Sequence, residues 1–308
     1  MKVVALAGGV GGAKLLSGLV RTMPPENLTV IVNTGDDFYW MGLYICPDLD
    51  TVTYTLAGMD NPQTGWGVRD DSFRALNRLR ELGTDTWFRV GDVDLATHLY
   101  RTEQMRCGSS LTSITRRITE RNGIRCRIFP MTDAPVPTLV ETSEGTLPFQ
   151  DYFVRRRCAP SVTGFTSRGI ERAQPPPGVL EAVEESSAVI ICPSNPFISI
   201  GPILSVPGLR EALRRTTAKV LAVTPIISGR AVKGPAAAML EQTGRDVSAV
   251  GVAELYRDFL DVFVLDERDK ALASRIAALG VQVHIADTLM NGSEDKLNLA
   301  RRLLAMVS

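Results

Sequence analysis

Two short acidic segments of the chain carry side chains that could bind a metal ion. Asp36-Asp37 follows the apolar run 28–32, and Asp48-Leu49-Asp50 comes a little later in the chain. Hard cations such as Mg²⁺ take carboxylate oxygens as ligands and usually share them with phosphate groups. Aspartate also caps helices, and Asp92-Val93-Asp94 repeats the same spacing. The two segments predict a metal site, with helix capping as the simpler alternative.

A glycine-rich segment precedes the acidic ones and could bind a phosphate. Ala7-Gly8-Gly9-Val10-Gly11-Gly12-Ala13-Lys14 lies between an apolar run and a helical pattern. Glycines there let the backbone approach an anion closely, at the amide end of the helix. Leu15 stands where a Walker loop has a hydroxyl, and Lys14 stands where the dinucleotide fingerprint has its third glycine. The segment therefore predicts a phosphate loop of another kind, or only a tight turn.

Two later loops are rich in proline and polar residues, and each follows an apolar run. The segment Cys192–Pro202 includes Ser194-Asn195-Pro196, and Thr224–Gly229 includes Pro225. Turn chemistry alone explains the composition of either loop. Because the carboxyl ends of parallel strands meet at one edge of a sheet, the pair favours a nucleotide pocket.

Apolar runs and helical patterns alternate at both ends of the chain, which is typical of a parallel sheet covered by helices. The predicted strands are 3–6, 28–32, 188–192, 219–223, 262–265 and 281–285. Helical patterns separate the later strands near 208–215, 233–243, 269–279 and 296–306. The fold class expected is α/β, with a Rossmann-like, mostly parallel sheet and helices on both of its faces.

The middle of the chain has a different pattern. Polar-faced helices are expected at 72–82 and 109–121, followed by short strands such as 138–142. Gln174-Pro175-Pro176-Pro177-Gly178 is typical of a linker. We therefore predict a nucleotide-binding core formed by 1–64 and 176–308, interrupted by a mixed α+β insertion at 65–175.

Composition excludes several classes of function. The 308 residues include 34 basic and 34 acidic side chains, so nucleic acid is a poor partner. No apolar run reaches the roughly 18 residues that a membrane-spanning helix needs. The five cysteines are dispersed and only two histidines are present, which argues against a disulfide framework or a histidine-rich metal centre. We expect a cytoplasmic protein with reduced thiols.

Taken together, the ordered motifs resemble the 2-phospho-L-lactate transferase family of coenzyme F420 biosynthesis, known as CofD or FbiA. The likeness extends over nearly the whole chain, and each motif alone is unspecific. The segments that carry it are Gly8–Lys14, Pro47–Thr51, Gly91-Asp92 with Ala96-Thr97-His98, Ser194–Pro196 with Ser199–Pro202, Gly251–Glu254, Asp261–Phe263 and Ala286–Met290.

The resemblance implies a magnesium-dependent transfer between two small molecules. The donor would be a guanosine 5′-diphosphate ester of 2-phospholactate, phosphoenolpyruvate or phosphoglycerate. The acceptor would be Fo, the 8-hydroxy-5-deazaflavin riboside, whose terminal hydroxyl attacks the phosphorus bearing the acyl unit. The products would be F420-0, or its dehydro form, and GMP. The family also suggests a homodimer, and the sequence does not decide which acid the donor carries.

The resemblance also implies roles for particular residues. Mg²⁺ would be bound by Asp37, Asp48 and Asp50. Asp50 and Asp48 are also the candidates for catalysis, and one of the aspartates, with Asp50 the first choice, would instead orient or deprotonate the acceptor hydroxyl. Arg89 would contact the deazaflavin or the phosphoacyl group. The residues expected to hold the GMP portion are Gly8, Gly9, Gly11, Gly12, Lys14, Asn33, Ser194, Asn195 and Pro196.

Two other functions compete with this interpretation. Some relatives of the family bind UDP-sugars and regulate metabolism without catalysis, and they share the glycine and Ser-Asn-Pro loops. A nicotinamide-dependent oxidoreductase is disfavoured by the broken glycine fingerprint. We expect His98 and His284 to be packed, hydrogen-bonded residues rather than catalytic ones.

Overall fold

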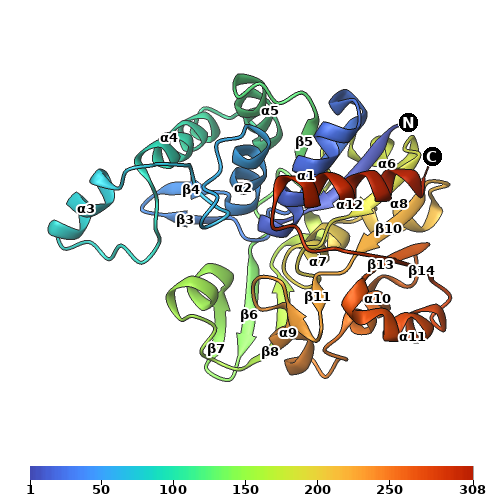
Figure 1. The fold of residues 1–308 in the computed structure, drawn as a ribbon. Helices are drawn as coiled ribbons and strands as arrows, with labels where there is room; N and C mark the ends of the chain where they lie inside the picture. Colours follow the sequence, from blue (N-terminus) through green and yellow to red (C-terminus); the bar gives the residue numbers. More distant parts are fainter. Residues whose placement is uncertain (308) are drawn as a thin grey trace.

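Seven parallel strands form the central sheet in the computed structural model, which describes residues 1–307 (Figure 1). Their order across the sheet is β14-β13-β10-β9-β1-β2-β5. The strands are β1 (Val3–Ala7), β2 (Leu28–Val32), β5 (Arg127–Pro130), β9 (Ala188–Ile191), β10 (Lys219–Val223), β13 (Val262–Asp266) and β14 (Gln282–Ala286). All six predicted strands are therefore present, and the sheet gains β5.

The strand order reverses beside β1. Val3 pairs with Leu28 of β2 on one side and with Ala188 of β9 on the other. Successive strands run outward from β1 to β5 in one direction and from β9 to β14 in the other. In a doubly wound sheet this reversal leaves a crevice outside the carboxyl ends of the two central strands. The loops that follow β1 and β9 lie at that crevice.

Helices cover both faces of the sheet because alternate residues of each buried strand point to opposite sides. Val4 and Leu6 belong to one apolar cluster, and Val3 and Ala5 belong to the other. The second cluster includes helices α1 (Gly9–Thr22), α2 (Pro47–Leu56) and α12 (Ser293–Ala305). The first includes α6 (Val179–Glu184), α7 (Ile200–Ser205), α8 (Leu209–Arg215) and α10 (Ala249–Tyr256). This arrangement confirms the predicted fold class.

Smaller elements project from this core (Figure 1). One group consists of the hairpin β3 (Phe38–Trp40)–β4 (Leu43–Ile45) and helices α3 (Arg74–Glu81), α4 (Asp92–Arg106) and α5 (Leu111–Arg121). The other is an antiparallel sheet of β6 (Thr138–Thr142), β7 (Gly145–Pro148) and β8 (Val162–Ser167). The remaining elements are β11 (Ile226–Ile227), β12 (Arg230–Ala231), α9 (Ala236–Gln242), α11 (Ala273–Ala277) and the short helical turns Pro25–Asn27, Asp151–Arg155, Ile170–Arg172 and Glu267–Leu272.

Strand β5 lies within the predicted insertion 65–175 but belongs to the central sheet. β5 pairs in parallel with β2 and forms one edge of that sheet. Its sequence, Arg127-Ile128-Phe129-Pro130, is short and ends in proline, which an edge strand tolerates because one side needs no hydrogen-bond donors. The mixed α+β elements therefore fall into two groups, one before β5 and one after it.

Candidate active site

The turn between β1 and α1 is joined directly to the loop after β9. The Gly8 N–H donates to Ser194 Oγ at 3.2 Å, and the Ser194 hydroxyl donates to the Gly8 carbonyl at 2.8 Å. Gly9 has a φ of +62°, which favours glycine because a Cβ is strained there. Two of the predicted nucleotide-binding segments therefore meet at the point where the strand order reverses.

The glycines of this turn are required by contacts within the protein. A Cβ on Gly11 would lie 2.3 Å from the Pro193 carbonyl oxygen, and one on Gly12 would lie 2.9 Å from Ser194 Oγ. A Cβ on Gly8 would lie 2.6 Å from Asp48 Oδ2. Close packing thus explains the glycine content, and phosphate binding by the turn stays a prediction. The first turn of α1, which has no side-chain cap, offers backbone amides to an anion.

Asn33, which directly follows β2, connects three segments of the crevice. Its side-chain amide donates to Asp48 Oδ2 at 2.9 Å and to the Ile198 carbonyl at 3.1 Å. Its Oδ1 accepts a hydrogen bond from the Gly35 N–H at 2.9 Å. Asn33 is fully buried with these partners. We infer from the geometry that it fixes the Asp48 carboxylate beside the glycine turn.

Asp48 and Asp50 both lie in the first turn of α2 and are buried. Proline at the first helical position and carboxylates in the first turn are typical of a helix start, but neither aspartate caps α2, because its N-cap is Cys46 and has no side-chain hydrogen bond. Burial raises the pKa of Asp48 to about 6, although the Asn33 amide and the Gly9 N–H oppose the rise. The pKa is higher than an exposed carboxyl would have because charge is poorly solvated here.

Asp36 and Asp37 form the second half of the acidic cluster. They are 7% and 5% exposed, and burial raises the pKa of both well above the ordinary value. The charge of Asp48 raises the pKa of Asp36 further. Asp36 Oδ1 and both oxygens of Asp37 are buried without a hydrogen bond among the described residues, although the Cys46 thiol and the Tyr44 hydroxyl lie close enough to Asp37 to affect the pKa values there. Buried carboxylate oxygens without partners fit a site for a hard cation.

Asp50 has a different partner, which the sequence interpretation missed. The Arg101 guanidinium on α4 donates from Nη1 to Asp50 Oδ2 at 3.0 Å and from Nη2 to Asp50 Oδ1. Arg101 is 2% exposed. Burial acts to lower the pKa of Arg101, but the surrounding groups, Asp50 first among them, together raise it. The pair is a buried, bidentate ion pair of the strong kind.

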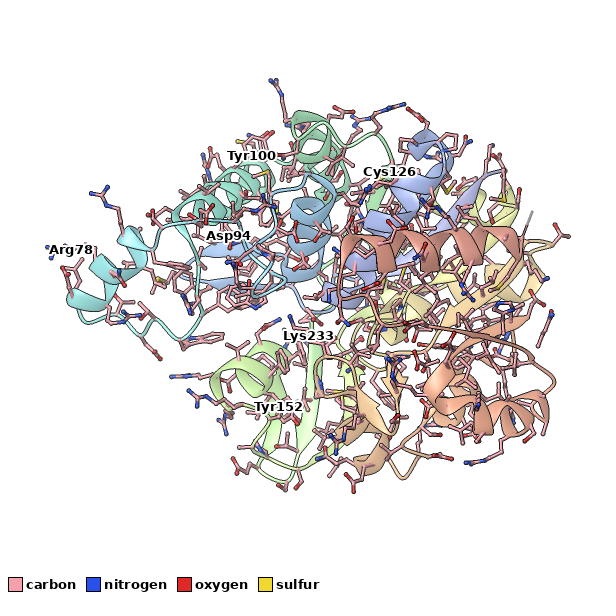
Figure 2. All side chains as sticks on the ribbon, viewed as in Figure 1. Arg78, Asp94, Tyr100, Cys126, Tyr152 and Lys233 are labelled. Carbon is pink, nitrogen blue, oxygen red and sulfur yellow. The ribbon has the colours of Figure 1, made fainter. Side chains whose placement is uncertain are left out.

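A chain of polar contacts continues from this pair along α4. His98 Nδ1 lies 3.2 Å from Arg101 Nη1, and His98 Nε2 lies 3.3 Å from Asp94 Oδ1. The Tyr54 hydroxyl donates to the same Asp94 oxygen at 2.8 Å. Figure 2 labels Asp94 on this helix. His98 is 1% exposed, so it is a packed residue held in a polar network.

Ligand atoms of Asp50, Asp94 and His98 lie within 4.8 Å of one another, which is a metal-like grouping among residues 1–307. The Arg101 guanidinium already contacts both Asp50 and His98 there and supplies a positive charge. A second cation at that point would be opposed by the guanidinium charge. Asp37 and Asp48 are not part of this grouping, and Asp48 lies beside the glycine turn.

The remaining predicted site residues have local roles that the structure defines. Lys14 Nζ donates to the Met290 carbonyl at 2.9 Å. Asn195 Oδ1 accepts from the N–H groups of Phe197 and Ile198, at 2.9 and 3.3 Å, so this side chain shapes its own loop. Pro196 is buried in the same loop.

Arg89 is exposed and lies away from these contacts. Its guanidinium stands over the Phe73 ring, 4.7 Å from the centroid. Trp87 and Phe88 pack against Phe38, with ring centroids 5.9 and 4.9 Å apart. Trp87 and Phe88 are therefore part of an aromatic cluster, whereas Trp66 is 39% exposed.

The spacing of residues on α4 held a signal that the sequence interpretation did not use. Asp94, His98 and Arg101 are separated by four and three positions. Residues at those separations share one face of a helix. This spacing places an acid, an imidazole and a guanidinium on one face of α4, the face from which Arg101 pairs with Asp50.

Comparison with known proteins places this geometry in a family. Residues 3–300 match the model of the family described as 2-phospho-L-lactate transferase CofD. The chain belongs to this family. The resemblance inferred from the motifs is thereby confirmed, as is the prediction of an enzyme of this family.

Curated relatives of the family carry two names. The 2-phospho-L-lactate transferase of Methanosarcina mazei is 45% identical over 97% of this chain and 98% of its own length. The phosphoenolpyruvate transferase of Kitasatospora aureofaciens is 40% identical over 99% of this chain and 98% of its own length. The Methanothermobacter thermautotrophicus protein, named 2-phospho-L-lactate transferase, is 42% identical over 99% and 98%.

A solved structure confirms the fold independently. The BH3568 protein of Bacillus halodurans, a member of the UPF0052 family, superimposes with a TM-score of 0.63 at 14% identity. The match covers 98% of each chain. None of the described helices of the present chain is long and apolar enough to cross a membrane.

Proposed function

We propose that this CofD-family enzyme transfers a phospho-acyl group from a guanosine-diphosphate-activated donor to the terminal hydroxyl of Fo. The products are F420-0, or its dehydro form, and GMP. The observation that carries the proposal is the position of the acidic cluster. Asp48 lies beside the glycine turn at the strand-order reversal, where nucleotides bind in doubly wound sheets, and its charge interacts with Asp36 and Asp37, whose oxygens include unpartnered ones.

The contact between Asp48 and the glycine turn supports magnesium dependence. The amide end of α1 attracts phosphate, but Asp48 Oδ2 lies within 2.6 Å of the Cβ position of Gly8 at that same end. A carboxylate and a phosphate placed together repel each other unless a cation lies between them. Asp37 and Asp48, with Asp36 adjacent, would hold Mg²⁺ against the diphosphate. When bound, Mg²⁺ would neutralise the charge that develops on the departing GMP.

Asp50 has the separate task of orienting the acceptor. Both of its oxygens contact Arg101, so its position is fixed, and each oxygen retains a lone pair for one further hydrogen. We assign Asp50 to the Fo hydroxyl, which donates to it. A carboxylate fixed in place by an arginine can hold the acceptor hydroxyl in one orientation. We therefore propose that Asp50 orients the acceptor hydroxyl and that Asp37 and Asp48 bind Mg²⁺.

The proposed reaction is a displacement at phosphorus. The hydroxyl oxygen of Fo forms a bond to the phosphorus bearing the acyl unit, the bridging P–O bond to GMP breaks, and the hydroxyl proton passes to solvent. The protein's own contribution is positioning and electrostatics. Asn33 fixes the Asp48 carboxylate and Arg101 fixes the Asp50 carboxylate by hydrogen bonds. Ser194 holds the glycine turn in place through its hydrogen bond to Gly8.

Arg89 and the aromatic cluster around it are proposed to bind the deazaflavin ring. Arg89 is exposed above the Phe73 ring, and a planar guanidinium stacks on aromatic systems. This cluster lies next to α4, the helix that carries Arg101. The acceptor would then reach from the aromatic cluster toward Asp50.

The acid carried by the donor is proposed to be 2-phospholactate. The relatives with that name reach 45% identity, compared with 40% for the Kitasatospora aureofaciens phosphoenolpyruvate transferase. Because these values differ little, phosphoenolpyruvate is the second candidate. We further propose that the enzyme is cytoplasmic and acts as a homodimer, as the family resemblance suggests.

A direct assay tests the proposal. The purified chain is incubated with Fo, Mg²⁺ and each guanosine-diphosphate-linked donor, and the products are identified by mass. We expect F420-0 and GMP with the lactyl donor, and loss of both products when Mg²⁺ is chelated. Failure with every donor, together with tighter binding of UDP-N-acetylglucosamine than of GDP, would favour a UDP-sugar-binding regulator instead.

A further inference from the structure

Three lysines lie beside α1 without a carboxylate partner. Lys14 is on α1, Lys296 is on the neighbouring helix α12, and Lys233 is in the loop between β12 and α9. No ion pair within residues 1–307 involves any of them. Lys14 and Lys233 instead donate to main-chain carbonyls, of Met290 at 2.9 Å and Thr64 at 2.6 Å. Within residues 1–307, none of the three ammonium groups is therefore neutralised by an ion pair.

The geometry brings Lys233 to the glycine turn. A Cβ built on Gly65, whose φ is +74°, would lie 2.7 Å from Val10 Cγ1 and 3.4 Å from Lys233 Nζ. The Lys233 ammonium is therefore a neighbour of Val10. Val10 and Lys14 are four positions apart on α1 and share a face of that helix. Figure 2 shows Lys233 near the centre of the view, between α1 and α2 above and the β6–β8 sheet below.

The lysines interact electrostatically across this space. Burial lowers the pKa of Lys14, and the charge of Lys296 lowers it further. Burial also lowers the pKa of Lys233, and the charge of Lys14 adds to that effect. Both shifts have the sign expected when positive charges lie together without an anion. An anionic ligand between them would relieve the repulsion.

We infer that Lys233 and Lys14 form an anion subsite that binds the distal phosphate of a nucleoside diphosphate. This inference rests on the proposed function, which puts the diphosphate at the glycine turn. The subsite lies on the Val10 side of that turn, whereas Asp48 lies at Gly8. A lysine ammonium has three donors, so Lys233 can contact a phosphate while it keeps its bond to Thr64. It supplies a compact point charge of the kind used by phosphate-binding lysines.

Binding of GDP and GMP tests the subsite without Fo or donor ester. Isothermal titration calorimetry with Mg²⁺ present compares the natural chain with Lys233→Gln and with Lys270→Gln, which removes an equal charge at an exposed position of the turn Glu267–Leu272. We expect Lys233→Gln to weaken GDP binding about tenfold, the loss typical of one charged hydrogen bond. GMP binding should change less than about threefold, and Lys270→Gln should change neither.

A second measurement separates a phosphate ligand from a loop contact. If Lys233 binds phosphate, raising NaCl from about 0.05 to about 0.5 M should weaken GDP binding less in Lys233→Gln than in the natural chain. The inference is overturned by an unchanged GDP affinity, by equal losses for GMP and GDP, or by an unchanged salt dependence. If the natural chain binds no guanine nucleotide, the proposed function falls as well.

Discussion

Replacing Arg101 with methionine tests whether this arginine is what makes a buried Asp50 tolerable. The two side chains are 2% and 5% exposed, and the guanidinium contacts both carboxylate oxygens. Methionine has a similar length and no charge, so Asp50 would remain buried without its cation. Removing one partner of a buried ion pair typically costs about 3–5 kcal/mol. We expect Arg101→Met to lower the free energy of unfolding by that amount.

The expected change in melting temperature follows from the size of the chain. Unfolding entropies near 2.1 cal/mol/K per residue give about 0.65 kcal/mol/K for 308 residues. A loss of about 3–5 kcal/mol then lowers the midpoint by about 5–8 K. Asp50→Asn/Arg101→Met leaves no unpaired charge, so the double variant should melt above the single Arg101→Met variant.

Differential scanning calorimetry provides the measurement, and Arg78→Met is the control. Arg78 (Figure 2) pairs with Glu81 on the surface of α3, where the side chains are 68% and 64% exposed. Such pairs contribute about 0–1 kcal/mol, so the control should melt within about 2 K of the natural chain. A shift for Arg101→Met no larger than that of the control would refute the reasoning. So would a double variant that melts no higher than the single one.

Three further predictions address the crevice and the exposed Arg89. Burial raises the pKa of Asp48 to about 6, so the stability that protonated Asp48 contributes is complete below the unfolded pKa near 3.8 and is lost as pH rises through about 6. Without Mg²⁺, the melting temperature of Asp48→Asn should therefore exceed that of the natural chain more at pH 7.5 than at pH 5. An equal difference at the two pH values would contradict this. Gly11→Ala should lower the melting temperature and GDP affinity together, because its Cβ would meet the Pro193 carbonyl; unchanged melting in a thermal scan would show that the loops can separate freely. Arg89→Ala should raise the KM for Fo several-fold and leave GDP affinity unchanged in calorimetry, whereas a loss of GDP affinity would place Arg89 at the donor.

The fold could be predicted from the sequence because the pattern of each buried strand is local. Buried parallel strands such as 28–32 and 219–223 are continuous apolar runs, and each is present at the predicted residues. The missing strand, β5, has four residues, begins with arginine and ends with proline, so its pattern is too short to distinguish from a loop. Its place beside β2 is set by pairing, which no local pattern records.

Only part of the candidate site could be predicted from the sequence, because some of its residues are brought together by tertiary packing that leaves no local pattern. Strand-end residues such as Asn33 and Ser194 could be placed at the crevice because the strands themselves were predicted correctly. Arg101 could not, because it comes from a projecting helix whose packing against α2 depends on tertiary structure. The glycine pattern predicts a phosphate loop or a tight turn, and it does not reveal that Gly11 also accommodates the Pro193 carbonyl, which comes from a distant segment.

The position of β1 has a consequence for how the chain is made. Its partner β9 begins at residue 188, so a ribosome must synthesise more than half of the protein before both edges of β1 are paired. Until then a fully buried strand of the finished molecule has one open edge, and such edges recruit other chains. A fragment that ends before residue 188 should therefore aggregate rather than fold.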